Sequence, residues 1–450
     1  MYYESGNMNQ ETKRALAADC LERIGQEVTL AGWVQTVRAH GKIAFFDLRD
    51  RSGSIQIVGV SEDLAKVVTN LNQQDVVEVK GTVKKRKDAF VNPHTPFGSI
   101  EIAAFSLAIL SKAETMPFDM AGKELVLELP TLLDHRSLSL RHPKVSAIFS
   151  VQASILEGFR KMAEKFNCTE IVVPTIANIA TEGGAEVFPV DYYGHKAYLT
   201  QSPQLYKQMM VPIFERVWTI AKAYRAESSV TTRHLAETTQ LDFEIGFINF
   251  EGLLDMFEEV AVGMLKHAEN ASKAILRSFN IPPIGFEKIP RFTLSQAQVI
   301  IFKAYKRDVR SQKDLSPQDE IDICAWVRKE YGSDLVTITH FPTKKRAFYT
   351  MPDPKNPEFS LSYDVLFRGV EILSGSQRIH EYDKLVAAIK TRGLDPKAFD
   401  MYLMAFRYGM PPEGGFSFGL ERITMKMLGL PNIRQASLFP RDMERVDERL

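Results

Sequence analysis

The chain has 450 residues, of which 45% are hydrophobic and 25% are charged, and its 56 basic side chains balance 56 acidic ones. This composition is typical of a globular protein of roughly two or three domains, and it excludes a strongly basic chain, so any nucleic-acid surface must be local. No apolar run approaches the length of a membrane span, and the amino-terminal residues lack the apolar core of a signal peptide. The dispersed cysteines Cys20, Cys168 and Cys324 lack metal-ligand spacing and favour reduced thiols in a cytoplasmic protein.

Residues 1–107 are predicted to form a small β domain. From Glu27 onward, alternating segments between glycine-bearing turns predict four or five strands and one helix at 61–71, a pattern typical of a closed barrel such as an OB-fold. A generic β domain of another purpose is the alternative. Aromatic and basic residues gather in this domain, which suits single-stranded nucleic acid, although only one of Phe45 and Phe46 can face outward on a strand.

Residues 108–143 are predicted to form a polar, proline-bearing connector, and residues 144–450 a second domain. Apolar residues recur at three- and four-residue steps over 144–166, which predicts an amphipathic helix, and a strand with Pro174 follows it. The rest of the second domain mixes strands and helices around one expected antiparallel sheet. Within it, residues at about 280–335 are predicted to form a mostly helical insertion, with Ser316 as a helix N-cap.

The segment 224–248 concentrates charged side chains that a hydrophobic core does not require. Its charged residues include Arg225, Glu227, Arg233, His234, Asp242 and Glu244. The first two are two apart and would share one face of a strand, the next two lie in a polar loop, and the last two would return on a second strand. Guanidinium groups suit bidentate phosphate binding. The alternative is a solvated surface hairpin held by ion pairs.

These residues carry a family resemblance. The segment 224–248 resembles the motif 2 hairpin of class II aminoacyl-tRNA synthetases, and four further sequences occur in that family's order: TEGGAEVF, QSPQLYKQ, EILSGSQRIH and GGFSFGLER. The chain as a whole resembles aspartyl-tRNA synthetases of the archaeal and eukaryotic type. The resemblance implies an α+β protein: an N-terminal OB-fold that binds the tRNA anticodon, then a class II catalytic domain with an antiparallel sheet flanked by helices. It also implies a homodimer, because the helix and strand of 144–174 resemble motif 1.

The implied reaction joins L-aspartate to tRNA(Asp) through aspartyl-adenylate, with the aspartate carboxylate attacking the α-phosphorus of ATP. No side-chain nucleophile is needed, since the enzyme contributes positioning and charge stabilisation. Arg225 and Arg422 are the implied catalytic residues. The residues implied to bind ATP are Arg225, Ala226, Glu227, Arg233, His234, Leu235, Glu371, Gly419, Leu420, Glu421 and Arg422. In the glycine-rich motif 3, Ser417 stands where the family often has glycine.

The residues implied to bind aspartate are Glu182, Gln204, Lys207, Arg225, Asp242, Ser374 and Arg378. Lys207 and Arg378 match the two cations that face the aspartate side chain. An asparagine amide there would leave buried charge unpaired, and eukaryotic asparaginyl enzymes usually have an apolar residue at the position of Lys207, so the pair favours aspartate. Gln204 and Asp242 would receive the α-ammonium group, and Glu182 lies in a glycine-bearing loop that would close over it.

Mg²⁺ is the implied metal, with Glu371, Ser374 and Asp364 as ligands, because hard oxygen ligands suit this ion. Asp364 and Glu371 are seven apart, so both can serve one ion only if the strand bends or bulges near Arg368 and Gly369. An ion pair is the alternative role of Asp364. In the barrel, the positions implied to contact the anticodon are Arg38, Phe45 and Gln56.

Three rival functions remain: an asparaginyl-tRNA synthetase, a catalytically silent RNA-binding relative, and an ammonia-dependent asparagine synthetase. The intact set of motif residues disfavours the second rival, and the N-terminal barrel disfavours the third. Whether tRNA(Asn) is charged alongside tRNA(Asp) stays open. In the resembled family this choice depends on the positions of Gln35 and 93–98, where Pro93 and Pro96 favour relaxed specificity.

Overall fold

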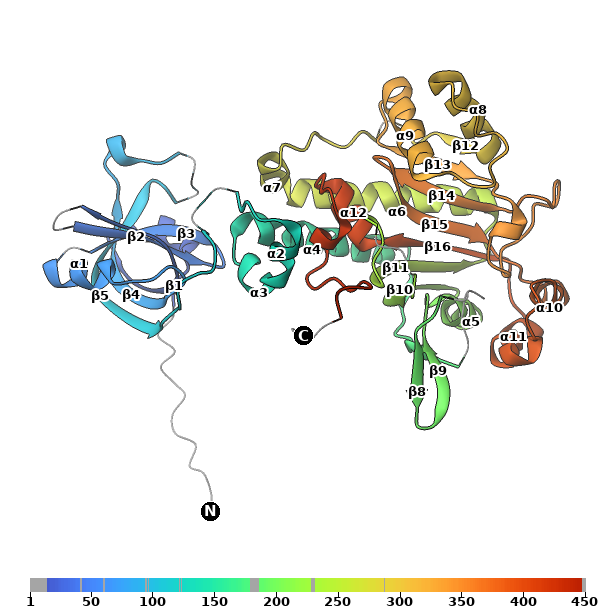
Figure 1. Ribbon diagram of the computed structural model, residues 1–450, viewed down its shortest axis with the longest axis horizontal. Coiled ribbons are helices and arrows are strands. Elements are labelled where there is room, and N and C mark those ends of the chain that lie inside the picture. Colours follow the sequence, from blue (N-terminus) through green and yellow to red (C-terminus); the bar gives the residue numbers. More distant parts are fainter. Residues whose placement is uncertain are drawn as a thin grey trace, which may run out of the picture. The chain divides into compact units, whose positions relative to one another are not determined.

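The computed structural model describes residues 14–446 except 41–42, 60, 94, 96, 121, 123, 179–185, 228–230 and 287. The chain divides into two compact units, Met1–Val126 and Leu127–Leu450 (Figure 1). Among the helices of the described ranges, none is both long and apolar enough to cross a membrane.

In the first unit, five strands of the described chain close into a barrel in the order β1-β2-β3-β5-β4. The strands are β1 (Glu27–His40), β2 (Ile43–Asp50), β3 (Gly53–Gly59), β4 (Val76–Lys85) and β5 (Ile100–Ser111). Alternation directs Phe46, Ile55 and Ile57 into the barrel core and leaves Gln56 outside. The predicted OB-fold is confirmed. Its last strand extends to Ser111, beyond the predicted boundary at residue 107.

One helix follows β3, and short helical turns flank the barrel strands. The helix is α1 (Glu62–Thr69), which Ser61 caps by accepting a hydrogen bond from the Leu64 backbone N–H. The 3-10 turns of this unit are η1 (Ala18–Glu22) and η2 (Asp88–Phe90). The segment 61–71 is therefore helical as predicted, although the helix ends at Thr69.

In the second unit, eight strands of the described chain form one sheet in the order β12-β13-β14-β15-β16-β11-β10-β6. Their bounds are β12 (Arg291–Thr293), β13 (Leu335–Thr339), β14 (Ser362–Phe367), β15 (Val370–Gln377), β16 (Glu413–Gly419), β11 (Glu237–Gly246), β10 (Arg216–Tyr224) and β6 (Thr169–Glu170). The inner strands pair antiparallel, as expected for class II enzymes. The edge strands β12 and β6 pair parallel to their neighbours, so the sheet is mixed.

Two long helices, α4 (Pro143–Lys165) and α6 (Phe250–Ala271), run across one face of this sheet (Figure 1). The apolar stripe of α4 is buried as predicted. Its Phe159 ring lies 5.7, 5.0 and 6.4 Å from the rings of Trp218, Phe243 and Phe418, in edge-to-face geometry on β10, β11 and β16. Because strand side chains alternate, the residues next to these aromatics face the opposite side of the sheet.

The remaining elements extend the second unit around the sheet. The helices are α2 (Leu129–Asp134), α3 (Arg136–Ser139), α5 (Gln204–Phe214), α7 (Lys273–Ser278), α8 (Leu294–Tyr305), α9 (Pro317–Tyr331), α10 (Tyr382–Thr391), α11 (Asp400–Arg407) and α12 (Leu420–Met427). The 3-10 turns are η3 (Thr343–Lys345), η4 (Pro396–Phe399) and η5 (Ile433–Ala436), and a small sheet contains β7 (Ile176–Ala177), β8 (Pro189–Tyr192) and β9 (His195–Leu199). The segment 280–335 contains the helices α8 and α9, and β12 within it joins the main sheet. Ser316 caps α9 as predicted.

Candidate active site

A cavity of about 310 Å³ lies on the sheet face opposite α4 and α6, where the alternating polar residues of β11, β15 and β16 point. It is lined by most residues that the sequence pattern predicted. They are Gln204, Lys207, Arg225, Glu227, Arg233, His234, Leu235, Asp242, Glu371, Ser374, Arg378, Gly419, Glu421 and Arg422. Segments more than 200 residues apart in the chain thus contribute to one site.

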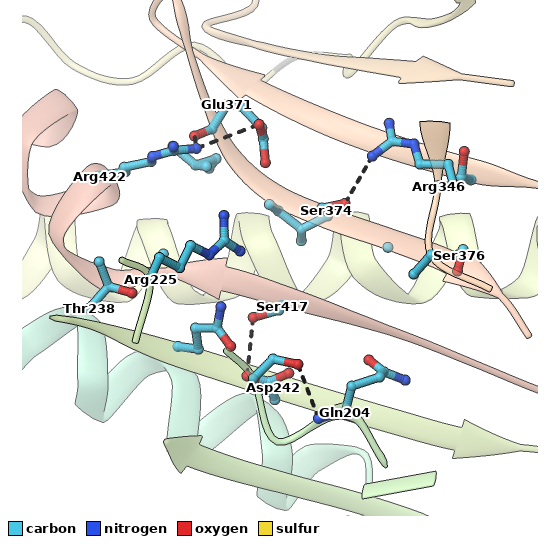
Figure 2. A pocket seen from close by; sticks show the side chains of 18 of the residues that line it. Gln204, Arg225, Thr238, Asp242, Arg346, Glu371, Ser374, Ser376, Ser417 and Arg422 are labelled. Atoms are coloured by element: carbon cyan, nitrogen blue, oxygen red, sulfur yellow. Dashed lines mark hydrogen bonds and ion pairs between the residues drawn. The ribbon is translucent and has the colours of Figure 1, made fainter. Parts of the chain in front are cut away.

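A row of polar residues crosses the sheet, and three of its members, Asp242, Ser417 and Ser374, line the floor of this cavity. Asp242 on β11 pairs with Ser417 on β16, Ser417 pairs with Ser374 on β15, and Ser374 pairs with Asp364 on β14. The Ser417 hydroxyl donates to Asp242 Oδ2 at 3.1 Å (Figure 2). Ser417, the departure from the usual glycine of motif 3, therefore adds a hydrogen-bond donor to the floor.

One end of the cavity holds a buried cluster of charges. Lys207 Nζ lies 2.7 Å from Asp242 Oδ1 and 3.2 Å from Glu244 Oε2. Arg378 Nε lies 2.8 Å from the other oxygen of Glu244, and Arg378 also donates to Gln204 Oε1 at 3.2 Å. The two predicted cations therefore flank Glu244, whose alternation with Asp242 the sequence showed but whose pairing role it did not.

Burial and these partners shift the carboxyl pKa values in opposite directions. Burial raises the pKa of Asp242, only partly offset by Lys207. Burial alone would raise the pKa of Glu244 too, but Arg378 and Lys207 outweigh it and lower that pKa. Glu244 is therefore the firmly ionised member of the cluster.

Glu413 on β16 lies behind this cluster and was not predicted. Its Oε1 accepts a hydrogen bond from Gln208 at 2.8 Å, while its buried Oε2 has no hydrogen-bond partner in the described part of the chain. Burial, reinforced by the negative charge of Glu244, raises the pKa of Glu413 well above its ordinary value. Both effects favour the protonated, neutral form of the Glu413 carboxyl.

The other end of the cavity is rich in arginine. Arg422 lies 3.5 Å from Glu371 Oε2 and donates to the Glu371 carbonyl at 3.0 Å (Figure 2). Arg225 lies 3.9 Å from Glu227. The prediction that these last two share a strand face is wrong, because β10 ends at Tyr224 and both residues follow it in the loop. They nevertheless line the cavity together.

His234 completes the arginine-rich end. Its Nε2 lies 4.0 Å from Glu227, and its Nδ1 lies 2.7 Å from the Thr231 hydroxyl. Burial, and next the positive charge of Arg422, lower the pKa of His234, so its imidazole is neutral at pH 7. A neutral imidazole beside several guanidinium groups can donate a hydrogen bond to an anion without adding charge repulsion.

Residues 128–443 match the family model of class II tRNA synthetases (D, K and N), and residues 28–110 match an OB-fold nucleic acid binding domain. The first match covers well over half of the chain. This chain belongs to the class II tRNA synthetases. The resemblance predicted from the motifs is confirmed, and the protein is an enzyme of that family.

The synthetase has close relatives of similar length. The aspartate–tRNA(Asp/Asn) ligase of Thermus thermophilus is 40% identical over 438 residues, 96% of this chain and 99% of that one. The aspartate–tRNA(Asp) ligase of Pyrococcus horikoshii is 39% identical, covering 94% and 96%. Among solved structures, the aspartyl-tRNA synthetase of Entamoeba histolytica has a TM-score of 0.86 at 28% identity, covering 99% of this chain and 95% of that one. The asparaginyl-tRNA synthetase of Pyrococcus horikoshii, complexed with asparaginyl-adenylate, has a TM-score of 0.85 at 31% identity, covering 94% and 97%.

Some predicted residues of the synthetase lie apart from the cavity. Glu182 lies outside the described residues. The described lining does not include Ala226, whose N–H donates to the Glu186 carbonyl, or Leu420, which is buried. Glu421 does line the cavity, yet both of its carboxylate oxygens accept from the Thr239 backbone N–H.

The three residues predicted to hold Mg²⁺ differ in their surroundings. Glu371 and Ser374 line the cavity, whereas Asp364 is buried and paired with Arg346 at 2.6 Å, the alternative role that its sequence context left open. The chain does turn at Arg368 and Gly369, both with positive φ, which brings β15 back beside β14. The second oxygen of Asp364, Oδ1, is buried and accepts no hydrogen bond from the described residues.

This donor set fits a magnesium ion that keeps most of its ligands from phosphate and water. Among the described residues no group of three or more histidine, cysteine or acidic side chains converges as a metal cage. Mg²⁺ characteristically takes one or two protein carboxylates, so the partly exposed carboxylate of Glu371 and the buried Oδ1 of Asp364 are chemically suitable. Burial raises the pKa of Asp364 to about 6 even though Arg346 opposes this.

The barrel of the synthetase presents the predicted anticodon residues on its outer surface. Phe46 is 1% exposed in the core, so Phe45 is the aromatic that faces outward. Phe45 pairs with Arg38 across β1 and β2, and Asp47 pairs with Gln56 across β2 and β3. The exposed Arg38 lies 3.4 Å from Asp47. These side chains form a mixed aromatic and polar strip of the kind on which bases stack.

Sequence reasoning missed several residues of the catalytic unit. Arg346 holds Asp364 and lies within 3.5 Å of Ser374 (Figure 2). Glu413 and Gln208 support the charged cluster, and Glu320 contacts Arg233. Gln208 ends the quoted sequence QSPQLYKQ but was not singled out within it. Arg346, Glu413 and Glu320 lie outside the quoted motifs, so no local pattern distinguished them from surface charge.

Proposed function

We propose that this synthetase activates L-aspartate with ATP and transfers the aspartyl group to the terminal ribose of tRNA(Asp). The observation that carries the proposal is the buried pair of cations, Lys207 and Arg378, on either side of Glu244 at one end of the cavity. The names of the relatives support the same reaction, since those described above at about 40% identity are aspartate–tRNA ligases.

The cation pair distinguishes aspartate from asparagine by hydrogen-bond chemistry. Lys207 and Arg378 are donors only, so they require an acceptor. The side-chain carboxylate of aspartate offers acceptors to both, whereas the amide NH₂ of asparagine would present a donor to one of them. Burying one hydrogen-bond donor against another costs several kcal/mol of binding free energy, which corresponds to selection against asparagine on the order of a thousand-fold. Asp242 would receive the α-ammonium group.

Catalysis at the other end of the cavity rests on positioning and charge. Arg225 would contact the α-phosphate, where negative charge develops during attack, and Arg422 would supply a second cation. His234 and Arg233 would contact the remaining phosphates. When bound, Mg²⁺ would neutralise phosphate charge, held by Glu371 and Ser374, with Asp364 as a third candidate.

Further parts of the proposal concern partners. The strip of Arg38, Phe45 and Gln56 would bind the anticodon. A homodimer would form through α4 and β6, and Val172, which follows β6, is 95% exposed. The enzyme would act in the cytoplasm, and light scattering of the purified protein tests the dimer.

The range of tRNAs is a separate question. Relatives are named both for tRNA(Asp/Asn) and for tRNA(Asp) alone. Gln35 accepts a hydrogen bond from Ser54 at 2.5 Å, Pro93 is exposed, and Pro96 lies outside the described residues. Aspartylation of tRNA(Asp) and tRNA(Asn) transcripts in parallel decides the range, and failure to mischarge tRNA(Asn) would refute dual charging.

The amino acid is tested by exchange of labelled pyrophosphate into ATP, with aspartate and asparagine assayed in parallel. Exchange with aspartate alone is expected. Exchange with asparagine instead would make the protein an asparaginyl enzyme, whose fold is equally close to this one. Absence of exchange with either amino acid would favour a silent RNA-binding relative.

A further inference from the structure

A carboxylate from the helical insertion reaches the arginine-rich end of the cavity. Glu320 lies in the first turn of α9 and is 6% exposed. Its Oε1 lies 2.8 Å from Arg233 in the loop between β10 and β11, and its Oε2 accepts a hydrogen bond at 3.3 Å from the backbone N–H of Glu371 on β15. One side chain therefore connects the two walls that surround the expected phosphates.

Glu320 holds the Arg233 guanidinium in place, but not all of the hydrogen-bond donors of that guanidinium are used. Glu320 contacts one terminal nitrogen of its guanidinium, while the buried Nε has no hydrogen-bond partner among the described residues. A guanidinium has five N–H donors in a rigid plane, so anchoring one edge orients the others. Arg233 lines the cavity, so the oriented donors are available to an anion bound there.

The second hydrogen bond of Glu320 is the one that it accepts from the Glu371 backbone N–H. The Glu371 side chain is paired with Arg422 at 3.5 Å, and Arg422 also binds the Glu371 carbonyl. By accepting from the Glu371 N–H, Glu320 fixes the third polar group of the same residue. Arg233, Glu371 and Arg422 are thus joined through one carboxylate of the insertion.

The start of α9 has stabilising contacts other than those of Glu320. The helix start is fixed by the capping box of Ser316 and Asp319 and by the ion pair of Asp319 with Arg307 at 2.5 Å. Asp319 is adjacent to Glu320 and is fully buried, but it contacts only elements of the insertion. The two neighbouring acids therefore have separable roles.

We propose that Glu320 is a positioning residue for ATP, which holds Arg233 and the Glu371 backbone in the geometry that binds the nucleotide phosphates. The proposal rests on the proposed ATP-dependent activation of aspartate. It assigns the insertion a part in nucleotide binding, through a residue that acts on Arg233 and Glu371 and lies outside the quoted sequence motifs.

The test compares Glu320→Ala and Glu320→Gln with the wild-type protein in pyrophosphate exchange, with ATP and aspartate varied separately. Loss of a charge-assisted hydrogen bond to Arg233 should raise the KM for ATP roughly tenfold in the alanine variant. The KM for aspartate should change less than about twofold, since its site lies at the other end of the cavity. Glu320→Gln retains an acceptor for Arg233 and should fall between the two, and calorimetric titration with ATP gives a readout that does not depend on turnover.

Asp319→Asn is the matched control for effects of α9 on folding, and the exposed Glu330→Gln is the control for charge. Asp319→Asn should lower the melting temperature, because Asp319 is buried in the capping box, and Glu330→Gln should preserve it. Neither variant should change the affinity for ATP. A double variant, Arg233→Met with Glu320→Ala, should lose less affinity for ATP than the sum of the two single losses, because part of the effect of Glu320 passes through Arg233.

An unchanged KM for ATP in folded Glu320→Ala would overturn the proposal. So would additive losses in the double variant, or an equal rise in the KM for ATP in Asp319→Asn, which would assign the effect to the helix. If the wild-type protein itself shows no aspartate-dependent exchange, the proposed function fails first. In that case, binding of ATP to the same variants still decides the role of Glu320.

Discussion

Lys207 Nζ lies 2.7 Å from Asp242 Oδ1, and both side chains are at most 2% exposed. The sequence had assigned these residues to opposite ends of the amino acid, Lys207 to the side-chain carboxylate and Asp242 to the α-ammonium group. Because buried charges require partners, the fold joins them in one neutral cluster with Glu244 and Arg378. In the proposed function, the bound aspartate would share Lys207 with the internal carboxylates Asp242 and Glu244, so specificity and stability would depend on the same contacts.

Replacement of Lys207 by methionine tests this coupling. The variant removes one cation from two buried carboxylates, which should lower the free energy of unfolding by about 3–5 kcal/mol. It should also reduce kcat/KM for aspartate by roughly a thousand-fold, because the side-chain carboxylate loses a donor. Thermal unfolding and pyrophosphate exchange measure the two effects.

Lys222→Met is the matched control for Lys207→Met. Lys222 lies on β10 and is paired with Glu237 at 3.1 Å, but its side chain is 49% exposed. Its replacement should change stability by less than about 0.5 kcal/mol. A Lys207→Met protein that unfolds at the wild-type temperature and still exchanges with aspartate would contradict the coupling.

Side-chain alternation and spaced motifs were sufficient to predict the parts of the site that lie on regular elements. The alternation of 241–245 correctly placed Asp242 on the polar face of β11. The sequence required a bent or bulged strand near Arg368 and Gly369 only if Asp364 and Glu371 bind one ion, and the structure has a turn between two strands there. The sequence could not give the register between strands. The row from Asp242 through Ser417 and Ser374 to Asp364 depends on pairings among distant segments.

No sequence pattern marked the residues that act through contacts with distant segments of the chain. Arg346 follows two lysines and Glu320 lies in an acidic helix start, so each reads as surface charge until folding buries it against a partner. Which of Phe45 and Phe46 faces outward can be decided only when the barrel interior is known, and that interior depends on strand order rather than on composition. The strand end at Tyr224 was missed because alternation continues into the loop.

Arg225→Lys should impair adenylate formation without affecting folding. Lysine retains the charge but cannot form the bidentate, planar contact with a phosphate, so the rate of adenylate formation should fall by roughly 10²–10³-fold. The side chain is 48% exposed, so stability should stay within about 0.5 kcal/mol. Rapid-quench measurement of a single turnover reports the chemical step directly.

Arg216→Lys provides the comparison for Arg225→Lys. Arg216 begins β10, lies 3.6 Å from Glu215 and is absent from the described lining of the cavity. Its replacement should leave the single-turnover rate unchanged. Equal rates for the two variants would remove Arg225 from the catalytic role.

Glu413→Gln should make the protein more stable at neutral pH. The fold raises the pKa of Glu413 above its ordinary value of 4.5, so the native state keeps a proton that the unfolded chain releases. Native Glu413 therefore binds more protons than unfolded Glu413, and wild-type stability should fall as the pH rises above about 4.5, by about 1.4 kcal/mol for each unit of pKa difference traversed. Glutamine resembles the neutral acid and can still accept from Gln208.

The measurement for Glu413→Gln is urea unfolding at several pH values between 4 and 8. The stability difference between the variant and the wild type should grow with pH and vanish near pH 4. Glu330→Gln, which replaces an exposed acid, should show no such trend. A constant difference across this range would mean that Glu413 is ionised in the fold.

Two glycines of β16 should respond differently to alanine because their surroundings differ. A Cβ on Gly415 would lie 2.1 Å from Glu244 Oε2 and 2.4 Å from the Phe243 carbonyl oxygen. Since backbone and a paired buried carboxylate cannot yield cheaply, Gly415→Ala should cost about 1–3 kcal/mol and displace Glu244 from Arg378. At Gly419 the nearest atom is 3.7 Å away on the flexible Arg422 side chain, so Gly419→Ala should cost less than about 1 kcal/mol. Urea unfolding midpoints compare the two variants, and equal losses would show that close packing against Glu244 does not determine the glycine at 415.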